Sequence, residues 1–240
     1  MAAIPLSHEP EIEYPESDGK PMAESDVHRE AMTHVIEGLK DHFLAEPEVY
    51  VTGNLLLYYE RGNRSAAVAP DVFVVRGVSK ERRKTYLLWR EQKVPCFVLE
   101  VTSETTRDED LDTKMDRYVR LGVEEYFLFD PLGDYLEPRF RGLRLVRGEY
   151  RPMRPEPDGS LVSRTIGVAF MPEGASLRMV DLKTGRRLLS YADWKARAQE
   201  EAVARRAAEE RAQQAEARAA EAEARARALT EELERLRHGS

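Results

Sequence analysis

FVLEVTSETTRDEDLDTKMDRYVRLGVEEYFLFD, residues Phe97–Asp130, is the stretch whose pattern decides the fold. Phe97–Val101 is an almost unbroken apolar run, which is typical of a strand covered on both faces. Asp108–Leu121 then has the character of a helix that stops at Gly122, and Glu125–Asp130 gives a second strand. A strand, a helix and a strand within so short a stretch predict a right-handed crossover between parallel strands.

Glu100 is the exception within the first apolar strand. A carboxylate in such a strand is costly to bury unless another group pairs with it. Lys114 falls in the helix that follows and is placed to reach back over the end of the strand. This acid and this lysine therefore need a chemical explanation.

A second acid stands in the apolar run Val68–Val75, where Asp71 shares a face with Phe73. Pro70 inside this run indicates an edge strand or a bulge, and a bulge would re-aim Asp71. Two carboxylates at the ends of neighbouring strands would form a hard-oxygen site that suits Mg²⁺ or Mn²⁺. The alternative is that the acids belong to ordinary turns and that the lysine is solvated.

An earlier helix is predicted from Ser25 or Asp26 to about Leu44, because Ser and Asp are good N-caps and the apolar residues follow a helical period. His28 lies on the apolar stripe near its start. One interpretation is a histidine hydrogen-bonded at the edge of the core. The other is a histidine that reaches the same cleft as Glu100.

Two segments are rich in basic residues. Lys80–Lys93 interleaves lysines and arginines with aromatic residues, and is either an exposed loop or helix with an aromatic anchor or a phosphate-contacting surface. Arg139–Arg154 repeats arginine at a spacing near two or three, which places several on one strand face. That face is either a strip that contacts a nucleic-acid backbone or an ordinary solvated surface.

The pattern divides the chain into three parts. Residues 1–24 form a Pro-rich acidic arm, residues 25–190 form the folded domain, and residues 191–240 are rich in Ala, Glu and Arg. The last part predicts one long helix, because these residues are good helix formers and no Gly or Pro occurs before Gly239. The positions that would form the seam of a coiled coil are mostly Ala and end in Leu229, Leu233 and Leu236. This pattern allows either a coiled coil or a single charged helix.

Composition excludes several classes of protein. The charged fraction of 34% exceeds the usual quarter, so part of the chain is expected to lie outside a core. The net charge of −7 argues against a generally basic nucleic-acid binder, although a local basic face stays open. Cys96 is the only cysteine and stands in an apolar run, which favours a buried structural thiol. With no apolar run long enough for a membrane span, we expect a cytoplasmic protein.

Four pieces of the sequence, taken together, resemble the Uma-two family of restriction endonucleases in the PD-(D/E)xK nuclease superfamily. They are Pro70-Asp71, Phe97–Ser103, Lys114–Tyr118 and Gly122–Pro131, in that order. The resemblance implies an α/β (α+β) fold with a restriction-endonuclease-like mixed β-sheet flanked by helices. It further implies that Asp71 and Glu100 hold Mg²⁺ or Mn²⁺, that Lys114 is the catalytic lysine and that His28 lines the site.

One position departs from the superfamily pattern, because Thr102 stands where lysine would complete Glu-x-Lys. The resemblance implies that Lys114 supplies that function from the helix. The expected activity is metal-dependent hydrolysis of DNA by a homodimer. The alternatives are an inactive nuclease-fold module for nucleic-acid binding or assembly, and a metal-dependent phosphoesterase acting on small nucleotides.

Overall fold

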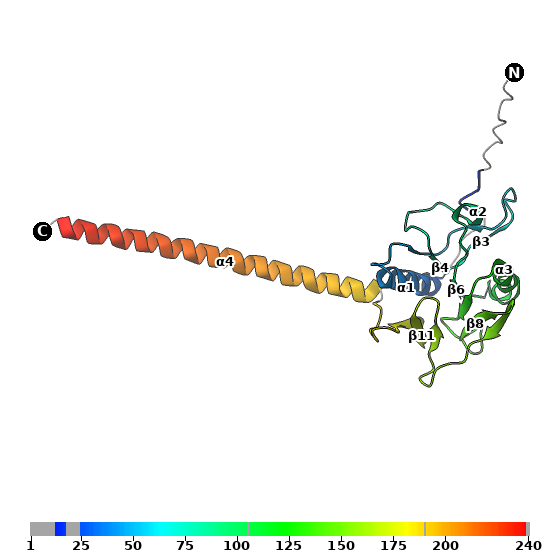
Figure 1. Cartoon of the computed structure of the whole chain (residues 1–240). Coiled ribbons are helices and arrows are strands. Elements are labelled where there is room, and N and C mark those ends of the chain that lie inside the picture. Colours follow the sequence, from blue (N-terminus) through cyan, green and yellow to red (C-terminus); the bar gives the residue numbers. More distant parts are fainter. Residues whose placement is uncertain (1–12, 18–24, 105, 190, 239–240) are drawn as a thin grey trace, which may run out of the picture. The chain divides into compact units, whose positions relative to one another are not determined.

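The computed structural model describes residues 13–17, 25–104, 106–189 and 191–238. The chain divides into two compact units, Met1–Tyr191 and Ala192–Ser240. The second unit consists of the helix α4, and the candidate site belongs to the first (Figure 1).

The helices of the first unit are short except for the first. They are α1 (Asp26–His42), α2 (Leu88–Glu91), the π-helix η1 (Glu109–Lys114) and α3 (Met115–Leu121). Its strands are β1 (Val49–Thr52), β2 (Leu57–Tyr58), β3 (Ala67–Val68), β4 (Val72–Arg76), β5 (Tyr86–Leu87), β6 (Phe97–Val101), β7 (Glu125–Phe129), β8 (Phe140–Val146), β9 (Glu149–Pro152), β10 (Leu161–Ser163), β11 (Val168–Glu173) and β12 (Ser176–Asp181).

The main sheet is mixed and has six strands in the order β1-β4-β6-β7-β8-β9. Strands β6 and β7 are parallel, and every other neighbouring pair in this sheet is antiparallel. Every residue of β6 and β7 is buried. The predicted pair of parallel strands joined by a helical connection is therefore confirmed, as is the mixed sheet flanked by helices.

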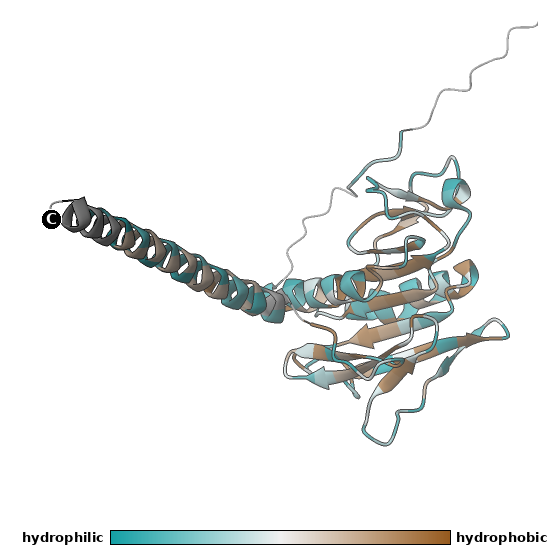
Figure 2. Ribbon diagram, turned by 60° about the vertical axis from the view of Figure 1, so that its left-hand side comes forward, coloured by the Kyte–Doolittle hydropathy of each residue, from teal (hydrophilic) through white to brown (hydrophobic). Residues whose placement is uncertain are grey.

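Each face of the main sheet carries its own hydrophobic core. On one face, Leu39 of α1 and Phe170 of β11 pack with Phe97 and Phe127. On the other, Tyr118 of α3 packs with residues that alternate with these along the strands, such as Tyr126. Hydrophobic colouring in Figure 2 is correspondingly concentrated in the strands of this sheet. Both central strands are thus covered on both sides, as their unbroken apolar sequences predict.

One expectation about a strand and one about a helix were wrong in detail. The run Val68–Val75 is divided between β3, which belongs to a three-stranded sheet β3-β2-β5, and β4 of the main sheet. Pro70 stands in the break, where it cannot donate a ladder hydrogen bond. The predicted helix Asp108–Leu121 begins instead as a π-helix and becomes an α-helix only at Met115.

The described residues of the N-terminal arm, 13–17, contact the rest of the first unit. The Tyr14 ring lies 5.0 Å from that of Tyr58 and 4.9 Å from that of Trp89. The Tyr58 hydroxyl also donates to the carbonyl of Pro15 at 2.8 Å. The rest of the arm, residues 1–12 and 18–24, lies outside the described residues.

The second unit is the helix α4, Tyr191–His238. Its described side chains are almost all exposed, and ion pairs one turn apart, such as Arg205 with Glu209 at 2.9 Å, support the helix. The side chains of Leu229, Leu233 and Leu236 are outside those that the structure describes, so the coiled coil stays a prediction. Across the described ranges, no helix is long and apolar enough to cross a membrane.

Candidate active site

A cleft of about 830 Å³ opens where the chain leaves β6 and β7. Residues from the start of α1, from the segment before β4 and from the loops after β6 and β7 line it. Among them are His28, Asp71 and Lys114, and the carboxylate of Glu100 contacts Asp71 and Lys114 beneath the surface. The fold therefore brings together all four residues that the sequence singles out.

Asp71 and Glu100 are held together by reciprocal contacts between their strands. Val72 pairs with Leu99, so Asp71 comes to lie beside Glu100 at the end of the ladder. The backbone N–H of Asp71 donates to Glu100 Oε2 at 3.2 Å, and the N–H of Val101 donates to Asp71 Oδ2 at 2.7 Å. Each carboxylate thus contacts the backbone of the other segment, which places both acids beside the cleft.

Gly53 explains how Asp71 is brought so close. A Cβ atom on Gly53 would overlap with the backbone carbonyl of Asp71, so only glycine permits this approach. The adjacent N–H of Asn54 donates to the carbonyl of Pro70 at 2.8 Å. The segment that re-aims Asp71 is therefore fixed by backbone contact with the turn after β1.

Lys114 and Tyr118 complete the surroundings of Glu100 from the helical connection. Lys114 Nζ lies 3.0 Å from Glu100 Oε2 and 2.9 Å from Asp110 Oδ1. The Tyr118 hydroxyl donates to Glu100 Oε1 at 2.5 Å. The π-helix η1 holds Asp110 and Lys114 inward, and both are buried. Lysine thus reaches Glu100 from the helix, while Thr102 fills the position two residues beyond Glu100 with a buried hydroxyl.

His28 is buried, with an exposed fraction of 5%, and its Nε2 lies 3.3 Å from Asp71 Oδ2. Ser25 caps α1 by accepting from the N–H of His28, which fixes the first turn of the helix at the cleft. The geometry agrees with the interpretation in which His28 reaches the same cleft as Glu100.

The electrostatics of this cluster are dominated by crowded acids. Burial, together with the carboxylates of Asp71 and Asp110, raises the pKa of Glu100 to about 8 even though Lys114 opposes the shift. Burial also raises the pKa of Asp110. Burial acts on Asp71 in the same sense, but His28 and Lys114 outweigh it and lower the pKa of Asp71. For Lys114, the surrounding acids outweigh burial and raise the pKa, so the ammonium stays charged.

The donor set fits a divalent cation with oxygen ligands. Asp71, Glu100 and Asp110 place three acids around one lysine and one histidine, so an added positive charge would relieve their mutual repulsion. In the described part of the chain, no group of three or more His, Cys, Asp or Glu side chains is arranged to hold a metal alone. Mg²⁺ is commonly held by one or two carboxylates with water and substrate phosphate completing its shell, and Asp71 with Glu100 would match that arrangement.

Sequence reasoning assigned no role to Asp110 or Tyr118. A signal for both was present, because they lie four residues before and four residues after Lys114, which places all three on one side of a helix. What the spacing does not reveal is the π-helix, whose wider turn is common at functional sites.

Cationic side chains also line the cleft. Arg64 and Arg117 belong to its wall, and the Arg117 guanidinium lies 5.6 Å from the Tyr59 ring centre and 3.4 Å from the carbonyl of Ala67. The basic segment Lys80–Lys93 contributes no residue to this wall among those the structure describes. Its charges are instead engaged elsewhere, for example Arg83 with Glu91 at 2.7 Å.

Comparison with known proteins identifies a family and solved structures with some similarity. A family model, Uma2, described as "Putative restriction endonuclease", matches residues 2–173. A solved structure with some similarity is that of "a putative nuclease belonging to DUF820" from Anabaena variabilis, at 15% sequence identity and a TM-score of 0.45, covering 61% of this chain and 76% of that chain. The structural likeness is too weak to carry a conclusion. No protein of curated function matches the sequence significantly.

Proposed function

The chain belongs to the Uma2 family, and from that membership and the cleft we propose that it is a Mg²⁺-dependent endonuclease that hydrolyses DNA phosphodiester bonds. The observation that supports this most is the convergence of Asp71, Glu100 and Lys114 at one cleft. Two acids can hold a metal ion that polarises a phosphate oxygen, and a lysine beside them can offset the charge that develops on the phosphate.

Asp71 and Glu100 would hold the metal ion, with Mn²⁺ as the alternative to Mg²⁺. When bound, the ion would supply Lewis-acid polarisation of a phosphate oxygen and a lowered pKa for a water molecule. The protein fixes the two acids through backbone N–H groups, namely those of Asp71 and Val101. Such fixed donors orient the carboxylates without a reorganisation cost during the reaction.

Lys114 would neutralise charge on the phosphate as the phosphorus becomes five-coordinate. Asp110 positions this lysine at 2.9 Å, and Tyr118 positions Glu100 from the opposite oxygen. His28, 3.3 Å from Asp71 Oδ2, would orient the substrate or a water molecule. Each proposed role belongs to a side chain that other groups already hold in place, as catalysis requires.

A nucleic acid is the substrate class that best fits the wall of the cleft. Arg64 and Arg117 add positive charge beside Lys114, and guanidinium groups suit phosphate oxygens. The same wall also carries Asp71, Glu104, Glu109 and Asp130, so a bound divalent cation together with the two arginines would supply the charge that holds a polyanion on a chain of net charge −7.

The proposal is tested by plasmid cleavage in the presence of Mg²⁺, Mn²⁺ or EDTA. We expect cleavage with either ion and none with EDTA. Lys114→Ala should bind the ion, as measured by calorimetry, yet lower the cleavage rate by about 10²–10³-fold. Lys183→Ala, at an exposed turn, is the matched control and should cleave normally. Absence of cleavage by the wild-type protein with both ions would contradict the proposal and favour an inactive nuclease-fold module.

We also propose that the protein is a homodimer, assembled through the first unit or through α4. The helix α4 has 48 residues, and the side chains described in it are almost all exposed, which favours pairing of this charged helix with a second copy. Light scattering on the full chain and on a chain truncated after residue 192 should show the dimer in the full chain. Equal association states would exclude α4 as the dimer interface, and a monomer in both would contradict the dimer itself.

A further inference from the structure

A second pocket, of about 330 Å³, lies at the opposite end of β8 from the active-site cleft. Phe140 pairs with Phe129 beside the cleft, whereas Arg144 pairs with Glu125, four residues along the strand. At ~3.4 Å per residue the two ends are about 14 Å apart, and the two linings share no residue. Four arginines and one glutamate supply the charged groups of this second lining: Arg144, Arg151, Arg154, Arg164 and Glu156.

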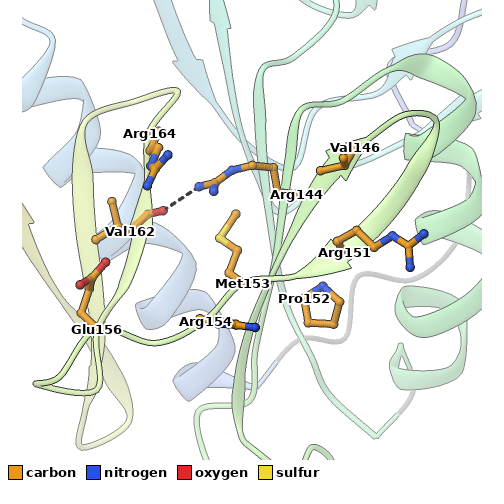
Figure 3. A pocket seen from close by; sticks show the side chains of 9 residues that line it. All are labelled: Arg144, Val146, Arg151, Pro152, Met153, Arg154, Glu156, Val162 and Arg164. Atoms are coloured by element: carbon orange, nitrogen blue, oxygen red, sulfur yellow. Dashed lines mark hydrogen bonds between the residues drawn. The ribbon is translucent and has the colours of Figure 1, made fainter.

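Arg144 gives the pocket a fixed cationic wall. Its Nη2 lies 2.9 Å from Glu125 Oε1 and donates to the carbonyl of Val162 at 3.2 Å (Figure 3). Glu125 also accepts from the hydroxyls of Ser163 and Thr165 and from the N–H of Arg164. One carboxylate is thus shared among several donors. The Arg144 side chain keeps 34% of its surface exposed, and it is held in place before any ligand arrives.

Two further arginines lack an acidic partner in the described part of the chain. Arg154 and Arg164 are exposed and form no ion pair there, although both line the pocket. In Figure 3 the Arg144 side chain extends toward the segment that carries Val162 and Arg164. Arg151 differs, because it pairs with Glu149 at 2.6 Å and extends away from the others.

Converging guanidinium groups repel one another unless an anion lies between them. Arg144 is paired with Glu125, and Glu156 is the one acid in the lining, so Arg144, Arg154 and Arg164 together carry one more charge than these two carboxylates offset. Arginine is suited to bind phosphate because its planar donors can contact two oxygens at once. The same pocket has apolar wall from Val146, Pro152, Met153 and Val162, which would contact the carbon atoms of a sugar or base.

We propose that this pocket binds the phosphate group of a nucleotide, at a site separate from the catalytic cleft. Arg144 and Arg164 would contact the phosphate from two sides, and Arg154 would add a third positive charge at the rim. The phosphate would come either from a free nucleoside monophosphate or from a nucleic-acid chain, since the chemistry recognised is the same. The proposal does not depend on cleavage activity, because none of its residues lines the cleft.

The test is calorimetric titration of the full chain with AMP, with adenosine, and with a single-stranded oligonucleotide of about four nucleotides. We expect saturable binding of AMP but not of adenosine. The double variant Arg154→Ala/Arg164→Ala should weaken AMP binding at least tenfold and leave plasmid cleavage within twofold of the wild type. Arg186→Ala, which removes an exposed arginine on the turn after β12, is the matched control and should bind AMP normally.

The two sources of phosphate give different outcomes. If AMP binding falls in the double variant, the pocket accepts a free nucleotide. If only oligonucleotide binding falls, the pocket accepts a phosphate within a nucleic-acid chain. If neither ligand binds, or if both bind equally well to the double variant and the wild type, the proposal is wrong. A failure of cleavage with intact AMP binding would count against the proposed endonuclease alone.

Discussion

Glu100 and Glu125 are both fully buried carboxylates on adjacent parallel strands, yet their surroundings differ in kind. Glu125 receives donors on both oxygens from backbone N–H groups, hydroxyls and Arg144, with no second acid among them. Glu100 receives Lys114 and Tyr118 but faces Asp71 and Asp110 as well, and its pKa is raised to about 8.

The difference teaches that burial of an acid does not by itself mark a functional site. The group around Glu125 joins β10 to the main sheet through Ser163 and Arg144. This role is structural, and the protein fulfils it without a ligand. The group around Glu100 places three acids with one lysine and one histidine beside an open cleft, and the pKa of about 8 means that Glu100 is costly to ionise there without a further positive charge. A buried acid that is costly to ionise without a ligand is the better indicator of function.

The largest effect is expected from Glu100→Gln, which should lower DNA cleavage by about 10³-fold or more, because a proposed metal ligand is lost. Stability should change little. Tyr118 can rotate its hydroxyl to accept from the new amide, and a neutral amide replaces a carboxyl whose raised pKa of about 8 already keeps it largely uncharged at neutral pH. Cleavage assays and thermal melts on the same preparation measure both. A large fall in Tm without loss of cleavage would make Glu100 a structural residue like Glu125.

Glu125→Gln is the same chemical change at the other acid, and it should lower stability while leaving cleavage nearly unchanged. Whichever way the amide turns, its NH₂ group meets fixed donors, the N–H of Arg164 on one side or the N–H of Thr165 on the other. We expect a loss of about 3 kcal/mol and a fall in Tm of roughly 6–12 °C. Metal-dependent cleavage below the melting range should stay within a few fold of the wild type.

The labelling rate of Cys96 gives an independent measure of local opening in the Glu125→Gln variant. Its thiol is buried, and burial raises its pKa to about 11, so it should react with iodoacetamide only after local opening. The N–H of Glu125 donates to the carbonyl of Cys96 at 3.1 Å, so opening at Glu125 exposes this cysteine. Glu125→Gln should speed its labelling, while Glu100→Gln should not. Equal labelling rates would show that Glu125 does not hold this end of the sheet together.

A smaller effect is expected from Gly53→Ala, which leaves every proposed catalytic residue in the sequence. The new Cβ would push against the backbone of Asp71 and displace it from Glu100. A shift of about 1 Å should lower cleavage by about 10²-fold. Gly38→Ala is the matched control, because its nearest neighbour is the flexible end of Met179, and cleavage should be kept. Normal activity in Gly53→Ala would mean that the exact approach of Asp71 to Glu100 is unimportant.

Much of the fold was readable from local pattern. The apolar runs at Phe97–Val101 and Glu125–Phe129 predicted two covered strands, and their spacing predicted a parallel pair. The first helix and the long helix α4 followed from caps and composition. The division of Val68–Val75 between two sheets was not predictable, because apolar character marks a strand but not its partner.

By itself, the sequence determined the candidate residues Asp71, Glu100, Lys114 and His28. Acids within apolar runs, and the order of the motifs that resemble the family, can both be recognised in the sequence without a structure. Only the tertiary structure decided how the surroundings of Glu100 differ from those of Glu125. Glu100 and Glu125 are indistinguishable as buried strand residues until the chain brings Asp110 to one and Ser163 to the other. The physical reason is that electrostatic free energy depends on distances of a few ångströms between groups far apart in sequence, and folding alone sets those distances.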